Sequence, residues 1–595
     1  MLLTENTNMS KFKNSYYFDI FILLSIYIVY FFIFLGWRHL SIPDEGRYPE
    51  IAREMLSSGN WVTPTINGVP FLDKPPLYYW LEATSINFFG INPWAIRLPQ
   101  ALFGILGCIS IYTFGRYFYS RFAGILASLI LSANVLYFFE AHYANMDLIV
   151  ANLLWIAFFL CLASLKQTNA KAKRLLMYTA YFVSALAFLT KGLMSIVFPC
   201  MTIFIWMLIT NNWYRLKELY IPTGAVLFVA IVTPWLVLAQ QQNPDFLYFF
   251  FYFQQFYRFV GHGFNNAIGP WFYFVVILAV FLPFSVLLLN RLFKGTKIIW
   301  QNRKQDSTTF LIASWCLLIL VFFSIPSSKI VSYILPIFAP LSLLMALSFE
   351  KIVKNNDNIT MFKKMHIITS IIFLVAAVAI IVFSLMQKLL LNTEVPLLYT
   401  TLVVVTALII AFSLKLSLKN QIKQAITLII FALMLLNILG QLVIPYFDLR
   451  TSEPLVTKVL NDSNSDTIFV YYNRPQPKHF ILKEELKQKG YDEDLPILLN
   501  GNIYIVYNWN TYKPEIDNWA REFYYGINQY KQAHNGQWPK YLITYPEFNK
   551  LLNTNKNIII FTSEKQLQKL KQTYPSINFE IKGSYNKNVV VMVVK

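Results

Sequence analysis

Apolar runs of about 20 residues recur along the first three quarters of this chain, and they limit what it can fold into. A run of that length can cross the hydrocarbon core of a bilayer as a helix. We count about thirteen such runs, the last centred near residue 435. The chain is 56% hydrophobic and 14% charged, which is too apolar for a soluble protein. The sequence therefore predicts a polytopic α-helical membrane protein.

The basic residues predict its orientation. The net charge is +19, but Lys and Arg are spread over short segments between alternate apolar runs, for example residues 166–174 and 291–304. By the positive-inside rule these segments and the N-terminus are cytoplasmic. No long basic tract or RNA-binding module occurs, so nucleic acid is not an expected partner. The first run, residues 16–37, lacks a following cleavage site and is expected to remain as an anchor.

The same pattern predicts two domains. Residues 1–445 form the membrane domain, with long external loops at about 38–95 and 241–270. Residues 446–595 are polar, with short β-like runs such as "TIFVYY" and "VVVMVV", and predict a small extracytoplasmic α/β domain. We expect this domain to support the protein or to contact an acceptor. The four cysteines lie inside apolar runs, without metal-binding or disulfide spacing.

The first external loop opens with "SIPDEGRYPEIAREML", which holds four acidic and two basic residues. Its pattern predicts a helix over residues 45–57, capped by Asp44 and lying flat in the membrane interface. An ordinary juxtamembrane helix with solvated charges is the alternative. Further along, "PFLDKPPLYYW" places Lys74 at headgroup depth, where a lysine can meet a lipid phosphate or simply extend to the interface.

Charged groups at the edges of later spans are also candidates, because charge near lipid is costly. Asp147 opens a span behind Glu140 and His142, and it needs a cationic partner from elsewhere in the chain. Arg258 interrupts an aromatic segment and suits a forked phosphate contact, or an interfacial anchor. Lys329 and Tyr333 are four residues apart and are expected to share one helix face.

These residues form a cationic and phenolic group and an acidic group on one face of the membrane. Such a combination suits a sugar linked to a lipid phosphate: cations stabilise the departing phosphate, while carboxylates orient sugar groups or accept a proton. No nucleotide site is visible on the cytoplasmic side. The donor is therefore expected to arrive through the bilayer as a lipid-linked sugar.

Several blocks of sequence carry a family resemblance. Residues 44–105, and then "AHYANMDL", "FLTKG" and "SSKIVSYILPIFAPL" in order, resemble the lipid A aminoarabinose transferases. These belong to the polyprenyl- and dolichyl-phosphate-sugar-dependent glycosyltransferases of the GT-C fold. The resemblance implies a GT-C fold, with Asp44 and Asp147 as catalytic acidic residues and Lys74, Arg258 and Tyr333 as ligands of the donor phosphate. Accessory roles are expected for Glu45, Arg47, Asp73, Lys329 and His142.

The resulting hypothesis is a glycosyltransferase of the bacterial inner membrane. It would move a sugar, such as 4-amino-4-deoxy-L-arabinose or galactosamine, from undecaprenyl phosphate to lipid A or a related acceptor. Membrane lipids surround it, and no cofactor is required, although nearby histidines leave a divalent metal possible. The alternatives are a protein O-mannosyltransferase using a polyprenyl-phosphate mannose, a lipid or sugar transporter, and a non-enzymatic scaffold.

Overall fold

A computed structural model describes the chain apart from residues 1, 258–266, 356–358, 392–396, 448–449, 473–491, 512–518, 555–556 and 595. The chain divides into two compact units. Unit 1 contains Met1–Trp37, Arg97–Ile231 and Ile268–Ile444. Unit 2 contains Arg38–Ile96, Val232–Ala267 and Pro445–Lys595. Unit 2 thus combines the C-terminal segment with most of the two stretches expected as long external loops. The predicted domain boundary after residue 445 stays a prediction.

Helices of Leu, Ile, Val and Phe make up unit 1, because a helix satisfies every backbone hydrogen bond within itself in an apolar medium. In the described part of the chain, nine helices are long and apolar enough to cross a membrane. The predicted α-helical membrane fold is confirmed, whereas the count of thirteen spans is not. The nine are α1 (Leu2–Phe32), α4 (Pro93–Phe118), α7 (Asp147–Lys166), α8 (Ala170–Lys191), α10 (Ile221–Gln242), α14 (Ser307–Ser324), η3 with α15 (Val331–Ile337 and Phe338–Asn355), α16 (Ile359–Leu391) and α18 (Ile422–Phe447).

Shorter helices complete this unit. Three of them are apolar but below spanning length by the same criterion: α5 (Arg121–Ala133), α9 (Met194–Thr210) and the apolar part of α17 (Leu397–Leu418). The others are α6 (Val135–Glu140), η1 (Trp213–Leu219), α12 (Phe272–Val280) and α13 (Ser285–Gln301). Polar side chains cap two helices of unit 1: Ser120 caps α5 and Asn169 caps α8 by accepting backbone N–H bonds.

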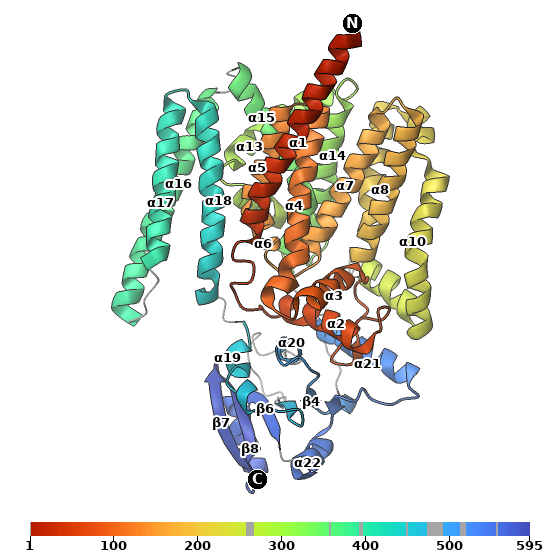
Figure 1. Ribbon diagram of the computed structural model, residues 1–595, viewed down its shortest axis with the longest axis vertical. Helices are drawn as coiled ribbons and strands as arrows, with labels where there is room; N and C mark the ends of the chain where they lie inside the picture. Colours follow the sequence, from red (N-terminus) through yellow and green to blue (C-terminus); the bar gives the residue numbers. More distant parts are fainter. Residues whose placement is uncertain are drawn as a thin grey trace. The chain divides into compact units, whose positions relative to one another are not determined.

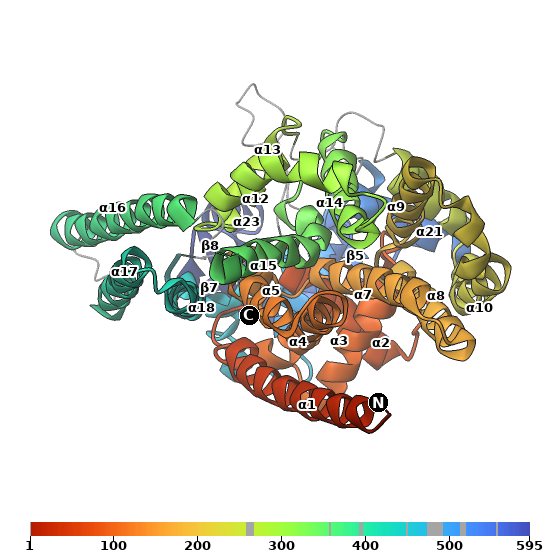
Figure 2. The ribbon, with the colours of Figure 1, turned by 90° about the horizontal axis from the view of Figure 1, so that it is seen from above.

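Close helix pairs make up much of unit 1. Helix α7 runs beside α8, α5 beside α15 and α16 beside α17, as both views show (Figures 1 and 2). Trp155 and Trp315 are fully buried, and the Trp315 ring stacks on Phe158 with 4.4 Å between centroids. Gly115 of α4 lies against Gly124 of α5, which lets the two backbones approach closely.

A buried carboxylate ties α1 to this core. Asp19 of α1 accepts hydrogen bonds from Arg121 (2.6 Å), Arg116 and Tyr112 (2.8 Å). A charge buried among apolar helices is stable only when paired, so these contacts hold α1, α4 and α5 together. Arg116 and Arg121, which are among the basic residues between apolar runs, therefore also stabilise the fold.

Unit 2 contains the predicted helix of the first loop, α2 (Asp44–Ser58), followed by the short strands β1 (Thr65–Ile66) and β2 (Val69–Pro70) and helix α3 (Leu77–Phe89). The strands β1 and β2 pair as an antiparallel hairpin. A π-helix, η2 (Tyr248–Tyr257), comes from the second predicted loop. The existence of α2 is confirmed, with one further residue at each end.

The C-terminal part of unit 2 is a six-stranded sheet in the order β5-β4-β3-β6-β8-β7. Strands β3 to β6 are parallel, whereas β8 runs antiparallel to β6 and β7. The predicted α/β fold of this segment is confirmed, although β7 was not predicted, because most of its residues are polar or small. The strands are β3 (Ile468–Tyr472), β4 (Tyr504–Val506), β5 (Leu542–Ile543), β6 (Ile558–Ser563), β7 (Asn578–Tyr585) and β8 (Asn588–Val594). The helices are α19 (Glu453–Val456), η4 (Leu460–Asp462), α20 (Leu495–Leu498), η5 (Trp509–Thr511), α21 (Trp519–Ala533), α22 (Tyr545–Thr554) and α23 (Glu564–Thr573).

Replacing Gly124 tests the close contact between α4 and α5. A Cβ at this position would lie 2.5 Å from the backbone oxygen of Tyr112, so Gly124→Ala must push the helices apart. We expect a loss of stability of about 1–3 kcal/mol, seen as a lower thermal unfolding temperature of the purified chain in detergent. Gly501→Ala is the control, because its Cβ would meet only one atom, at 3.8 Å. Equal unfolding temperatures for the two variants would contradict this packing.

Candidate active site

Helix α2 begins with Asp44, whose carboxylate accepts a hydrogen bond from Arg47 at 2.7 Å. The residue at the helix cap is Pro43, and no side chain caps the helix. The prediction that Asp44 caps α2 is therefore wrong: it lies in the first helical turn. An acidic group is favourable there because the N-terminus of a helix carries partial positive charge.

The remainder of α2 is buried, from Glu45 to Met55. The alternative of a juxtamembrane helix with solvated charges is therefore wrong for these residues, whereas the position of α2 in the membrane interface stays a prediction. The carboxylate of Glu45 is held by Arg38 (2.5 and 2.9 Å) and by the backbone N–H of Ser41. The Asp44 side chain keeps 29% of its surface exposed, whereas that of Glu45 is fully buried. Within α2 an incoming molecule can reach Asp44, but not Glu45.

Asp73 and Lys74 lie between β2 and α3. The Lys74 ammonium donates a hydrogen bond to Asp73 Oδ2 at 2.7 Å, and its side chain is 15% exposed. Burial raises the pKa of Tyr48 on α2, and the nearby charges of Asp44 and Asp73 raise it further. The Arg47 guanidinium that binds Asp44 also lies against the ring of Phe71, two residues before Asp73, so unit 2 brings Asp44 and Asp73–Lys74 near one another.

Arg47 is the central cation of this group. Its guanidinium lies over the rings of Tyr48 and Phe71, 5.3 and 5.7 Å from their centroids. Burial opposes its charge, but Tyr48, Asp44, Glu493 and Glu522 outweigh this and raise the pKa of Arg47. The predicted accessory residue Arg47 is therefore held as a cation between α2 and the C-terminal segment, beside Asp44.

Unit 1 contains a second group, around Asp147 at the start of α7. Its carboxylate accepts hydrogen bonds from the Lys191 ammonium at the end of α8 and from the Ser332 hydroxyl on η3. The Lys191 nitrogen also lies 4.4 Å from the ring centroid of Tyr333. Asp147 and Lys191 are both buried, while Tyr333 is partly exposed. The expectation that Asp147 needs a distant cationic partner is confirmed, and the partner is Lys191.

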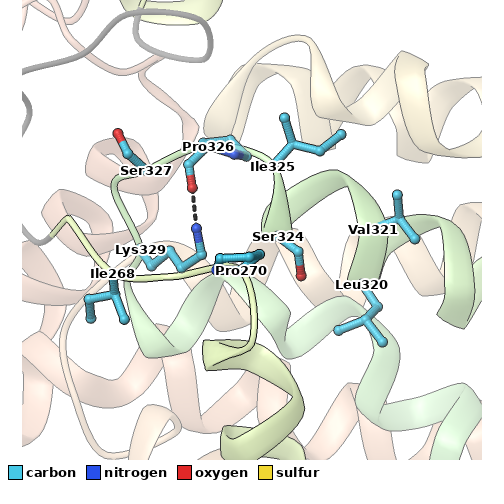
Figure 3. A pocket seen from close by; sticks show the side chains of 9 residues that line it. All are labelled: Ile268, Pro270, Leu320, Val321, Ser324, Ile325, Pro326, Ser327 and Lys329. Atoms are coloured by element: carbon cyan, nitrogen blue, oxygen red, sulfur yellow. Dashed lines mark hydrogen bonds between the residues drawn. The ribbon is translucent and has the colours of Figure 1, made fainter.

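Lys329 makes a different contact. It precedes η3, which begins at Val331, so the prediction that it shares a helix face with Tyr333 is wrong. Its ammonium donates to the carbonyl of Pro326 at the edge of a cavity of about 480 Å³ (Figure 3). This cavity is mainly apolar, and Asp147, Lys191 and Tyr333 do not line it.

Two other predicted residues have different outcomes. His142 is buried, with Nδ1 2.9 Å from the carbonyl oxygen of Phe138, and packs against the rings of Phe31 and Phe138. It therefore contributes to helix packing in unit 1. Arg258 lies outside the described residues. Just before it, Gln254 on η2 donates to Glu522 of α21 at 3.3 Å, within unit 2.

Sequence reasoning gave no role to Lys191 or Ser332. The signal for Lys191 was present, because a lysine that ends an apolar run in "FLTKG" is costly unless paired. Ser332 gave no signal. Nor did the sequence indicate that Glu493 and Glu522, far along the chain, help to raise the pKa of Arg47.

The residues of the described ranges contain no group of three or more His, Cys, Asp or Glu side chains arranged to hold a metal ion. The Nδ1 atom of His39 lies 2.6 Å from Glu453 Oε2. The four cysteines are unpaired thiols. The expectation that no metal is required stays a prediction.

The fold is that of the GT-C glycosyltransferases. Over 96% of this chain and 97% of the other, it matches a solved structure of ArnT from Cupriavidus metallidurans bound to undecaprenyl phosphate, with a TM-score of 0.77 and 21% identity. The apo structure of the same protein matches equally well. A family model described as dolichyl-phosphate-mannose-protein mannosyltransferase matches residues 73–238.

Curated relatives carry more specific names than the family model. An undecaprenyl phosphate-α-4-amino-4-deoxy-L-arabinose arabinosyl transferase of Wigglesworthia glossinidia brevipalpis is 30% identical over 65% of this chain and 66% of its own length. The proteins of the same name from Serratia proteamaculans and Pseudomonas savastanoi are 31% and 33% identical over 61% and 56% of this chain. The matched part spans 61–66% of the length of these three relatives. The chain therefore has the GT-C fold and is similar to these arabinosyl transferases over less than two thirds of their length.

Breaking the Asp147–Lys191 pair tests the group in unit 1. Lys191→Met leaves a buried carboxylate without its cation, so we expect a loss of about 3–5 kcal/mol in unfolding free energy. The double variant Asp147→Asn, Lys191→Met removes both charges and should regain part of that loss. Thermal unfolding of the wild type, Asp147→Asn, Lys191→Met and the double variant measures this coupling. Additive effects of the two substitutions would contradict a direct pair.

Glu493 makes unit 2 sensitive to alkaline pH. Burial raises its pKa from 4.5 to about 8; Asp492 and Asp494 add to this, while Arg47 opposes it. The folded protein therefore keeps a proton that the unfolded chain releases, and its stability falls as pH rises from about 5 through 8. Glu493→Gln should reduce this fall in unfolding temperature between pH 5 and 9, whereas Glu564→Gln, at an exposed position, should not. An unchanged pH profile for Glu493→Gln would contradict the buried proton.

Proposed function

We propose that the chain is an integral-membrane glycosyltransferase. It moves an amino sugar, such as 4-amino-4-deoxy-L-arabinose or galactosamine, from undecaprenyl phosphate to a phosphate of lipid A or a related acceptor. The names of its relatives support the donor and the sugar. The acidic group of unit 2 supports an amino sugar as well, because carboxylates favour a cationic ligand.

The exposure of Asp44 carries this proposal. Every other carboxylate of α2 is buried, and Arg38, Arg53 or backbone groups hold it in place. Asp44 alone on this helix combines a carboxylate with substantial exposure, and Arg47 fixes its direction. A carboxylate held in this way can orient an acceptor or receive its proton.

The reaction breaks the bond between the anomeric carbon of the sugar and a phosphate oxygen. An acceptor oxygen attacks from the opposite face, and undecaprenyl phosphate leaves with the bonding electrons. A proton on the acceptor passes to Asp44; an acceptor that is already ionised has no proton to lose, and Asp44 then only orients it. Lys74, Arg258 and Tyr333 stabilise the departing phosphate.

Asp147 has a different task. Its carboxylate accepts hydrogen bonds from Lys191 and Ser332. These bonds make it a poor proton acceptor and hold it rigidly in place. We propose that Asp147 holds Lys191 over the Tyr333 ring. Lys191 in turn keeps the Tyr333 phenol in position at the donor phosphate. In this account no metal takes part in the reaction.

The proposed setting is the bacterial inner membrane. The N-terminus would be cytoplasmic, and Asp44, Lys74 and the C-terminal segment would face the periplasm. The distribution of basic residues between the apolar runs supports this orientation. A donor carried by a lipid and an acceptor anchored by acyl chains both reach that face within the membrane.

Protein O-mannosylation is the second candidate, supported by the family model that matches residues 73–238. Mass spectrometry of lipid A from cells with and without the gene separates the two functions. Addition of an amino sugar to lipid A only in cells with the gene supports the proposal. Unchanged lipid A would contradict it, and mannose on secreted proteins would establish the alternative. A transporter would leave the sugar–phosphate bond of the donor intact.

Asp44→Asn tests the assigned residue. We expect modification of lipid A to fall by about 10²-fold or more, because the amide cannot accept the proton and pairs weakly with Arg47. The measurement is the modified fraction of lipid A at equal protein level in the membrane. Asp466→Asn, at an exposed position in the C-terminal segment, is the matched control and should keep full activity. Full activity of Asp44→Asn would remove Asp44 from the mechanism.

A further inference from the structure

The turn between β1 and β2 is bound to the C-terminal segment of unit 2. Asn67, in this turn, is fully buried. Its side-chain amide donates to the carbonyl of Ile503 at 2.9 Å, and its side-chain oxygen accepts from the N–H of Ile503 at 2.9 Å. One side chain thus satisfies both backbone groups of the residue that precedes β4. Such a reciprocal pair of hydrogen bonds fixes both the distance and the orientation of the turn relative to Ile503.

The neighbouring residue, Asn502, binds the end of α2. Its amide donates to Glu54 at 2.7 Å, and its oxygen accepts from Arg53 at 3.0 Å. Glu54 also accepts from the N–H of Gly68 at 2.9 Å and from the hydroxyl of Thr65. The end of α2 and the β1–β2 turn therefore bind two adjacent residues of the C-terminal segment, Asn502 and Ile503.

Two glycines allow close backbone contact on the same surface. A Cβ at Gly526 of α21 would lie 1.9 Å from the carbonyl oxygen of Pro70 in β2. A Cβ at Gly46 of α2 would lie 2.6 Å from the backbone nitrogen of Asp494. No side chain fits at either position, so the first loop rests directly on the backbone or helix of the C-terminal segment.

These four contacts, Gly46 with Asp494, Glu54 with Asn502, Asn67 with Ile503 and Pro70 with Gly526, are called the clamp. Asp44 is two residues from Gly46, and Asp73 is three residues from Pro70. Because the clamp fixes residues only a few positions away, Asp44 and Asp73 have little freedom to move. We propose that the clamp makes the C-terminal segment a positioning element for Asp44 and Lys74. Only the predicted effect of the clamp on activity rests on the proposed function.

A merely stabilising role predicts a different outcome. If the clamp only added stability, variants that weaken it would lower the unfolding temperature and the amount of protein but not the turnover of folded enzyme. If it positions the site, turnover falls while donor binding changes little, because misplacement of reacting groups affects the transition state most.

Hydrogen exchange of the full-length protein tests the contact without any need for activity. We expect Asn67→Ala and Asn502→Ala to speed exchange in residues 59–76 at least tenfold, since both remove bonds that close this loop. Asn553→Ala, at an exposed position on α22, is the matched control. Asn67 has a positive φ of 50°, so Asn67→Gly relieves the backbone while losing the same side-chain bonds. Protection in Asn67→Gly equal to that of the wild type would overturn the clamp.

Transfer kinetics test the positioning. For the folded Asn67→Gly and Asn502→Ala proteins we expect kcat to fall about 10- to 100-fold, with the KM for the donor within about twofold. Faster exchange with unchanged kcat would overturn the positioning role. If the wild-type protein transfers no sugar, the proposed function fails, whereas the exchange experiment still decides whether the clamp exists.

Discussion

Charge buried in an apolar chain must be paired within the protein, and this constraint organises both units. In unit 1, Asp19 is held by Arg116 and Arg121, and Asp147 by Lys191. In unit 2, the buried carboxylates of α2 are matched by Arg38 and Arg53. Because an unpaired partner would cost several kcal/mol, each pair fixes the elements that carry it. Asp44 differs through its exposure, which leaves it accessible for chemistry.

The α-helical membrane fold, the α/β character of the C-terminal segment and helix α2 were predictable from apolar run length and periodicity. What α2 touches was not. Its acidic and basic residues have the pattern of a surface helix, yet they are buried, since their partners lie as far away as Asn502. Similarly, the sequence showed that Asp147 needs a cation, but only the packing of α8 against α7 identifies Lys191. A single sequence does not show which residues distant along the chain pair with one another.

The two groups of polar residues divide the proposed chemistry. Unit 2 supplies a partly exposed carboxylate and an ammonium, Asp44 and Lys74, on a loop bound to the C-terminal segment. Unit 1 supplies a phenol, Tyr333, beside a rigid pair of Asp147 and Lys191. Neither group resembles a metal site or a covalent nucleophile with its base. Stabilisation of a departing phosphate, together with orientation of an acceptor, is the chemistry these side chains can perform.

Release of undecaprenyl phosphate by the purified protein tests the central claim most directly. The donor, undecaprenyl phosphate with its amino sugar radiolabelled, is mixed with lipid A and the protein in detergent, and both products are separated. We predict that undecaprenyl phosphate and labelled lipid A appear in equal amounts, that both require lipid A, and that both are lost in Asp44→Asn. An intact donor, or release that does not depend on lipid A, would contradict the account.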